Sequence, residues 1–218
     1  MSMHPQFVEL HNRYEGRIFL LGSGHSLTLL TAEDKMLLER EYTFAGARYF
    51  KWNQVQPSFY IVAEDAQMAE WQERGFAQAS AKVAKFAVEW QPAPLGWIPV
   101  ARPESLSYHH YTNAETSLSS FEGECAHIHM AHDVPLAALQ VARYMGFTEF
   151  YLLGCETTES GYAWDVHERR KVRDRSGTMI PMYAKAKREV GGRLYDCTPA
   201  GKLNKALGFI PVREVLAR

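Results

Sequence analysis

The segment 133–156 constrains the fold most, because a helix is followed there directly by a buried strand. Asp133 and Pro135 are typical of a helix start, and Gly146 is typical of its end. The apolar run Phe150 to Leu153 has the length of a buried strand and stops at a glycine. A helix and a buried strand in this order form half of a parallel βαβ unit, which indicates an α/β protein.

A second apolar run, Arg17 to Leu21, ends in the turn Gly22-Ser23-Gly24-His25-Ser26. Glycines allow a ligand to approach the main chain closely, and a following helix would direct free amides and its positive dipole end at an anion. The pattern is also typical of an ordinary strand-to-helix turn. The turn therefore predicts either a phosphate site or a plain connection.

Polar residues are predicted at the carboxyl ends of the next strands, where open α/β sheets build their sites. Thr31 to Asp34 predicts a capping box and a helix to about Arg40. The expected strands are Ala47–Trp52, which ends at Asn53-Gln54, and Ser58–Ala63, which ends at Glu64-Asp65.

The remaining elements follow from periodicity and from breaker residues. A long amphipathic helix is expected over residues 66–86, a short strand over 97–100, a helix over 183–190 and a strand over 193–197. Residues 104–126 are polar and aperiodic, which predicts a loop that acts as a lid over a site or is disordered.

Composition narrows the class of protein. With 218 residues, 46% of them hydrophobic, the chain can bury one core, so a single domain spanning 1–218 is expected. A net charge of -1 gives no reason to expect nucleic acid as a partner. Three cysteines without a Cys-x-x-Cys pair favour a reducing cytoplasm, and no apolar stretch approaches the ~20 residues of a membrane span. A homo-oligomer is one of the assemblies that the sequence allows.

A histidine-containing segment and a cationic run could carry chemistry. His127, His129 and His132 invite a metal hypothesis, but a solvent-facing stripe or a single catalytic histidine is favoured, so no metal site is predicted. His132 could act as a general base, and Asp133 could cap a helix or bind a ribose hydroxyl. The cationic run in 169–175 could bind a diphosphate or form a solvated loop.

Four segments carry a resemblance to a known family. They are Ile18–Leu27, with Gly-x-Gly-His-Ser-Leu; Tyr49–Gln54, ending in Asn-Gln; Ala142–Glu156, ending in Gly-x-Glu; and Tyr162–Asp165, Tyr-Ala-Trp-Asp. Their order resembles bacterial sialyltransferases of glycosyltransferase family 42. It also resembles the related domain of unknown function 115, found in motility accessory factor glycosyltransferases and in archaeal 6-hydroxymethylpterin diphosphokinases. His25 replaces that family's proline, Glu156 its aspartate, and Asp133-Val134-Pro135 its Thr-Ser-Gly.

The resemblance implies a Rossmann-like three-layer sandwich with a mostly parallel sheet, which binds a nucleotide or nucleotide sugar. It implies that the turn 22–26 binds phosphate. The residues expected near the nucleoside or sugar are Asn53, Gln54, Asp133, Gly154, Glu156 and Tyr162. The residues expected in catalysis are His132, Asp165 and His167, with one histidine deprotonating the acceptor hydroxyl.

Three functions are compatible with these residues. The first is a nucleotide-sugar-dependent glycosyltransferase, similar to sialyltransferases, which needs no cofactor and uses a glycan or another hydroxyl compound as acceptor. The second is a pyrophosphokinase that needs Mg²⁺, held by carboxylates such as Glu64, Asp65 or Asp133. The third is a nucleotide-binding domain without catalytic activity.

Overall fold

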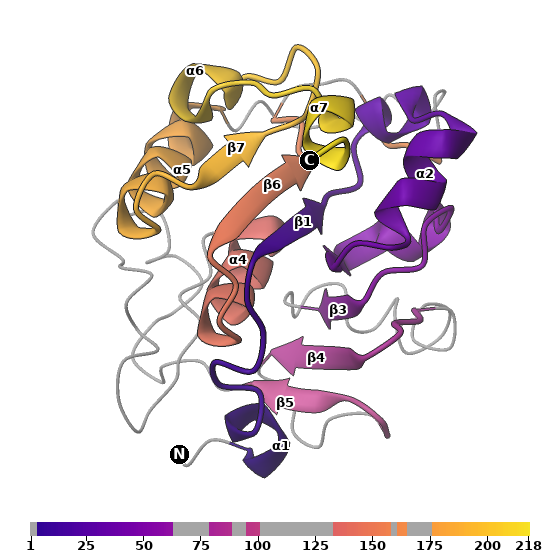
Figure 1. Cartoon of the computed structure of the whole chain (residues 1–218), viewed down its shortest axis with the longest axis vertical. Coiled ribbons are helices and arrows are strands. Elements are labelled where there is room, and N and C mark those ends of the chain that lie inside the picture. Colours follow the sequence, from indigo (N-terminus) through magenta and orange to yellow (C-terminus); the bar gives the residue numbers. More distant parts are fainter. Residues whose placement is uncertain (1–3, 63–78, 89–94, 101–132, 158–160, 165–175) are drawn as a thin grey trace.

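The computed structural model describes residues 4–62, 79–88, 95–100, 133–157, 161–164 and 176–218. Its centre is a seven-stranded sheet in which every strand pair is parallel (Figure 1). The strands are β1 (Arg17–Leu21), β2 (Thr43–Gly46), β3 (Phe59–Val62), β4 (Ala84–Val88), β5 (Ile98–Val100), β6 (Glu149–Leu153) and β7 (Leu194–Asp196).

The strand order β5-β4-β3-β2-β1-β6-β7 contains one reversal of direction. The chain starts at β1, moves outward to β5, and then returns to the other side of β1 to form β6 and β7. The strands β1 and β6 pair over their full length, from Arg17 with Glu149 to Leu21 with Leu153. The topological switch point, where open α/β sheets bind ligands, therefore lies at the carboxyl ends of β1 and β6.

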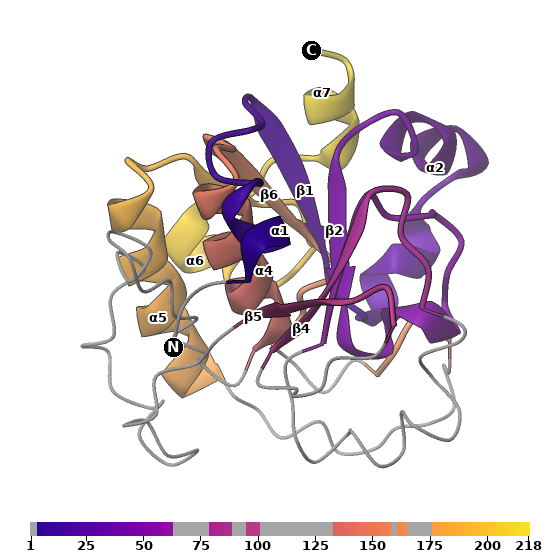
Figure 2. The same ribbon diagram turned by 90° about the horizontal axis from the view of Figure 1, so that it is seen from below.

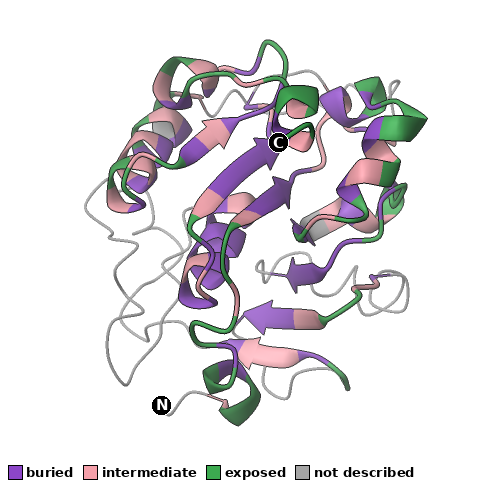
Figure 3. Ribbon diagram, in the orientation of Figure 1, coloured by how far each residue is buried: buried purple, intermediate pink, exposed green. Residues whose placement is uncertain are grey.

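Alternate residues of the strands face opposite sides of the sheet and pack into two separate cores. Along β1, Ile18 and Leu20 lie in one core, whereas Phe19 and Leu21 lie in the other. The strands β1, β2, β3 and β6 are buried along almost their whole length, as expected for a parallel sheet covered on both faces, whereas the edge strand β5 is mostly half-buried (Figure 3). The fold is a Rossmann-like three-layer α/β sandwich, as the sequence predicts.

Helices cover both faces of the sheet, with α1, α4, α5 and α6 on one face and α2 on the other (Figure 2). The α-helices are α1 (Pro5–Val8), α2 (Ala32–Leu38), α4 (Val134–Tyr144), α5 (Ser176–Glu189), α6 (Asn204–Leu207) and α7 (Val212–Leu216), and two 3₁₀ helices are η1 (His25–Leu29) and η2 (Ala47–Lys51).

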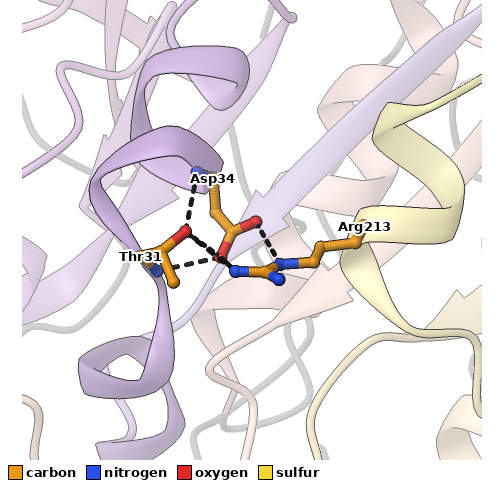
Figure 4. Close-up of polar contacts among 3 residues, drawn as sticks. All are labelled: Thr31, Asp34 and Arg213. Atoms are coloured by element: carbon orange, nitrogen blue, oxygen red, sulfur yellow. Dashed lines mark hydrogen bonds and ion pairs between the residues drawn. The ribbon is translucent and has the colours of Figure 1, made fainter.

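The amino end of α2 is held by the expected capping box and by α7 (Figure 4). The Asp34 amide donates to Thr31 Oγ1 at 3.2 Å, and the Thr31 amide donates to Asp34 Oδ2 at 2.8 Å. Arg213 of α7 adds a bond from Nε to Asp34 Oδ1 at 2.9 Å and one from its terminal nitrogen to Thr31 Oγ1 at 3.1 Å. A helix near the end of the chain thereby completes a cap near its beginning.

One predicted element and the end of another are wrong, and residues 66–78 of the second lie outside the described residues. Residues 47–51 form η2 instead of a strand, because the second strand is already complete at Gly46. The end of the helix expected over 66–86 is instead β4, since residues 84–88 pair with β3 and β5 and bury Phe86 inside the sheet. Phe86 is a buried strand residue, whereas Val83 precedes the strand and is exposed, so their helical spacing is a coincidence. The α5 helix begins at Ser176, before the expected Tyr183.

Several predictions lie outside the described residues. They concern the expected lid 104–126, the histidines His127, His129 and His132, the strand-end carboxylates Glu64 and Asp65, and the segment from Asp165 through His167 to the cationic run.

Candidate functional site

Two glycine turns meet at the switch point. The turn after β1 continues the sheet ladder, with the Gly22 amide donating to Leu153 O at 2.8 Å. The Gly24 amide then donates to Gly154 O at 2.9 Å, so the turn after β1 is bonded to the turn after β6. The structure thus brings together two segments that the sequence separates widely.

Their glycines are required by this close approach. A Cβ on Gly22 would lie 2.1 Å from Gly154 O, which is far inside van der Waals contact. A Cβ on Gly24 would lie 1.3 Å from Glu156 Oε2. Gly154 has φ +71°, and a Cβ there would lie 2.6 Å from Leu27 Cγ. These glycines therefore let two backbone turns and one carboxylate occupy the same small space.

Glu156 lies at the turn 22–26, where the sequence predicts a bound phosphate. The Ser26 amide donates to Glu156 Oε1 at 2.5 Å. The other oxygen, Oε2, is buried and has no hydrogen-bond partner among the described residues. The element that follows the turn is the short helix η1, not the longer helix whose dipole was expected to attract phosphate.

Other polar groups of the turn are unused. Within the described residues, the amides of Ser23 and His25 donate no hydrogen bond. His25 Nδ1 and Ser26 Oγ are buried and also lack a partner there. Free donors therefore lie beside an anchored carboxylate, and together they could bind a ligand that carries both an anionic group and hydroxyls.

The segment 161–164 packs onto this turn. Tyr162 pairs with Gly24 in an antiparallel bridge, and the Ala163 amide donates to Ser23 O at 3.1 Å. The rings of Tyr162 and Trp164 stack with centroids 4.5 Å apart and planes 12° apart. Lys51, at the end of η2, places its ammonium 5.7 Å from the Trp164 ring centre. An aromatic pair with one cation thus borders the turn.

Asp196, at the end of β7, is a site residue that the sequence patterns did not reveal. It is fully buried, and its Oδ1 accepts a bond from the Thr198 amide at 2.9 Å. Burial raises its pKa to about 6, and the charge of Glu156 adds to this effect, although the bonds to Thr198 oppose it. The available signal in the sequence was its place near the end of the strand predicted over 193–197.

Cys155 lies between the carboxylates of this edge. Its amide donates to Thr198 Oγ1 at 3.2 Å. Burial raises the pKa of its thiol well above the usual value, and the nearby charges of Asp133, Asp196 and Glu156 raise it further. Cys155 is therefore a neutral packing residue within the electrostatic influence of three carboxylates.

Asp133 precedes α4 but does not cap it with its side chain, contrary to the prediction. Its Oδ2 instead accepts a hydrogen bond from the Tyr183 hydroxyl of α5. Burial and Asp133 raise the pKa of Tyr183 well above its usual value, so this phenol remains a donor. The bond ties α4 to α5 beside Cys155. This position leaves Asp133 in the neighbourhood of the site.

Asn53 and Gln54 lie beyond η2, and both are exposed. Asn53 has φ 37° and donates its amide to Tyr49 O, and Gln54 Oε1 accepts from Lys35 Nζ at 2.5 Å. Neither residue hydrogen-bonds to the turn 22–26 within the described parts of the chain. Lys51 of η2 reaches the site through the ring of Trp164.

The described residues contain neither a metal cluster nor a membrane-spanning helix. No group of three His, Cys, Asp or Glu side chains among them is placed to hold a metal ion. None of the described helices is long and apolar enough to cross a membrane.

Comparison with known proteins supports the fold. No family model matches the sequence, and no curated protein matches it. Among solved structures, the sialyltransferase CstII from Campylobacter jejuni, in complex with the substrate analogue cytidine-5′-monophosphate, has a similar fold. It shares 13% identity with a TM-score of 0.52, over 90% of this chain and 85% of that one. The MAf glycosyltransferase from Magnetospirillum magneticum AMB-1 matches at 15% identity and a TM-score of 0.47, over 90% of this chain and 33% of its own.

Proposed function

We propose that this protein is a glycosyltransferase that transfers a sugar from a nucleotide donor to an acceptor hydroxyl. The observation that carries the proposal is the arrangement at the switch point: Glu156 is anchored on the Ser26 amide through one oxygen and leaves the other without a partner among the described residues. The sialyltransferase of similar fold was solved with a nucleotide, which adds support for a nucleotide as ligand.

The proposal assigns different parts of the donor to different groups. The free amides of Ser23 and His25, with the Ser26 hydroxyl, bind the phosphate. Glu156 Oε2 accepts a hydrogen bond from a hydroxyl of the ribose or of the sugar, since a carboxylate at a switch point can bind such a diol. Tyr162 and Trp164 border the same space and offer an aromatic surface to the base or sugar.

The chemistry of transfer needs a base for the acceptor hydroxyl, and His132 or His167, with Asp165 nearby in sequence, remains our proposal for it. The reaction we propose requires no metal, because the amides and the cationic run 169–175 would stabilise the leaving phosphate. A sialic-acid-like donor sugar, a glycan acceptor and a cytoplasmic location belong to the same proposal.

The test is nucleotide binding, measured by thermal shift and calorimetry with cytidine, uridine, guanosine and adenosine mono- and diphosphates. We expect at least one pyrimidine nucleotide to bind, with the same affinity in EDTA and in Mg²⁺. Gly24→Ala, which must push Glu156 off the Ser26 amide, should weaken that binding by more than tenfold. Gly177→Ala, at a position with open space, is the matched control.

Absence of binding by every nucleotide would refute the glycosyltransferase and leave no support for a nucleotide site. Binding of ATP that depends strictly on Mg²⁺ would favour the pyrophosphokinase instead. Nucleotide binding without sugar transfer or hydrolysis of any nucleotide sugar tested would favour the non-catalytic domain.

A further inference from the structure

Asp196 has a feature that fold stability does not explain. Its side chain is fully buried, Oδ1 is bonded to the Thr198 amide, and Oδ2 has no hydrogen-bond partner among the described residues. An asparagine could accept the same bond from Thr198 through its amide oxygen without placing a charge in the interior. A buried carboxylate with one unused oxygen destabilises a fold, so its presence here points to a role in the site.

Thr198 connects Asp196 to the turn that carries Glu156. Its amide donates to Asp196 Oδ1 at 2.9 Å, and its hydroxyl oxygen accepts the Cys155 amide at 3.2 Å. The next residue after Cys155 is Glu156, whose carboxylate receives the Ser26 amide. A continuous path of three hydrogen bonds therefore runs from β7, through the turn after β6, to the turn after β1.

The charges around Asp196 are mostly negative or neutral. Glu156 acts on it directly, and Asp133 lies across Cys155 on the Tyr183 hydroxyl. Cys155, Cys197 and Tyr183 all have raised pKa values, so they are neutral. Two lysines of this part of the chain are hydrogen-bonded: Lys187 Nζ donates to Leu207 O, and Lys202 Nζ donates to Ser176 Oγ.

We propose that Asp196 is a positioning residue for Glu156, and that it takes up a proton when an anion binds in the turn after β1. The proposal rests on the proposed function, which places phosphate at that turn. The proton comes from solvent and forms an O–H bond at Oδ2, the oxygen that receives no donor from the described residues. The charge of the anion is then partly offset by the loss of the Asp196 charge, and Glu156 keeps the hydrogen bond that its Oε1 accepts from the Ser26 amide.

Two consequences distinguish this role from a structural one. First, anion binding is linked to proton uptake, because a new negative charge raises the pKa of a nearby carboxyl further. Second, the pKa of about 6 places this exchange near neutral pH, where a normal aspartate would already be fully ionised. Since Asp196 is buried, it acts through Thr198 and through its charge, without touching substrate.

The first experiment uses the protein without any ligand. The Ser26 amide resonance of the whole chain is followed by ¹⁵N–¹H NMR from pH 4.5 to 8, in the wild type, Asp196→Asn and the remote charge control Glu9→Gln. We expect a transition with a midpoint near pH 6 in the wild type and in Glu9→Gln, and its loss in Asp196→Asn. A Ser26 resonance without that transition in the wild type, or with it in Asp196→Asn, would overturn the proposal even where no nucleotide binds.

The second experiment measures proton uptake with cytidine-5′-monophosphate as the probe. Calorimetric titrations at pH 6.5 in two buffers of different ionisation enthalpy give the protons taken up, and the difference between wild type and Asp196→Asn cancels the ionisation of the nucleotide itself. We expect less uptake in Asp196→Asn and wild-type uptake in Glu9→Gln. Equal uptake in wild type and Asp196→Asn would contradict the proposal, whereas binding alone would still support the proposed function.

Thr198 variants test the hydrogen-bonded path. Thr198→Val removes the hydroxyl, and with it the acceptor of the Cys155 amide and the side-chain bond between Thr198 and Asp196, while it keeps the backbone bond to Asp196. We therefore expect binding of the same probe to weaken about tenfold or more, the effect of losing buried hydrogen bonds. Thr198→Ser keeps the hydroxyl and should restore the wild-type affinity. Equal affinity in all three proteins would remove Thr198 from the path and overturn the positioning role.

Discussion

Two polar regions of this protein differ in how completely their hydrogen bonds are satisfied. At the contact between α2 and α7, both Asp34 oxygens, the Thr31 hydroxyl and the Arg213 guanidinium are paired (Figure 4). At the switch point, buried polar atoms lack partners among the described residues: His25 Nδ1, Ser26 Oγ, Glu156 Oε2, Thr157 Oγ1 and Asp196 Oδ2. Unpaired buried groups destabilise a fold, so the first region serves stability and the second is available for a ligand.

The two regions also contain aspartates whose pKa values shift in opposite directions. Burial would raise the pKa of Asp34, but its bonds to Arg213 and Thr31 outweigh burial and lower it. At Asp196 the bonds to Thr198 do not outweigh burial, and burial raises its pKa to about 6. An ionised aspartate therefore stabilises the fold at position 34 and destabilises it at position 196.

The largest effect is expected for Gly22→Ala. Its Cβ would meet the backbone oxygen of Gly154 at 2.1 Å, so β1 and β6 would have to move apart. We expect a loss of about 3 kcal/mol or more in the free energy of unfolding, measured by urea denaturation. Gly24→Ala meets mainly the flexible end of Glu156 and should cost less stability. If Gly22→Ala were as stable as the wild type, the two turns would not be in contact.

Asp196→Asn should stabilise the protein at neutral pH. A carboxyl with a raised pKa contributes most below its unfolded value of 3.8 and loses this contribution as the pH rises through about 6. The difference between these two pKa values sets a ceiling of about 3 kcal/mol on the gain at pH 7.5. Thermal melts of both proteins from pH 4 to 8 should converge toward pH 4. A less stable variant at pH 7.5 would show that the charge is structurally required.

Asp34→Asn should change the free energy of unfolding in the opposite direction and destabilise the protein at neutral pH. Because the pKa of Asp34 is lowered, its contribution is fully present above pH 4 and is lost as the pH falls through the lowered value. We expect a loss of about 1 to 2 kcal/mol at pH 7, in line with a hydrogen bond to a charged group. The difference from wild type in urea denaturation should shrink below pH 4. A difference that is constant with pH would mean that the ion pair with Arg213 contributes nothing.

The smallest effects are expected for Thr31→Ala and Gly177→Ala. Removing the cap hydroxyl should cost about 1 kcal/mol. Gly177 lies in α5 and an added Cβ would meet nothing within 4 Å, so an alanine there should stabilise by about 0.5 to 1 kcal/mol. Both values come from thermal or urea unfolding. Nucleotide affinity should be unchanged in both variants, and a change would show that the two regions are coupled.

Much of the fold was predictable from local patterns. The strands β1, β3, β5, β6 and β7, the capping box of α2 and the helix α4 follow from apolar runs, breaker residues and start signals. The errors at η2 and β4 arose where the same apolar residues fit either a helix or a strand, and pairing with neighbouring strands decided between them.

The candidate site was predictable in part. The turn 22–26 and Glu156 were both expected in it, and the structure brings them together. Their bond was not predictable, because it depends on β6 returning beside β1. Asp196 was missed because its buried position and raised pKa come from packing around it, which no local pattern reports.

By itself, the sequence determined where strands stop at glycines and where helices start, because these features depend on residues close together in the chain. Only the tertiary structure decided that Glu156, not a helix dipole, meets the Ser26 amide, and that Asp196 lies one strand away with an oxygen unused by the described residues. The physical reason is that strand order sets which groups become neighbours, and burial then sets their charge.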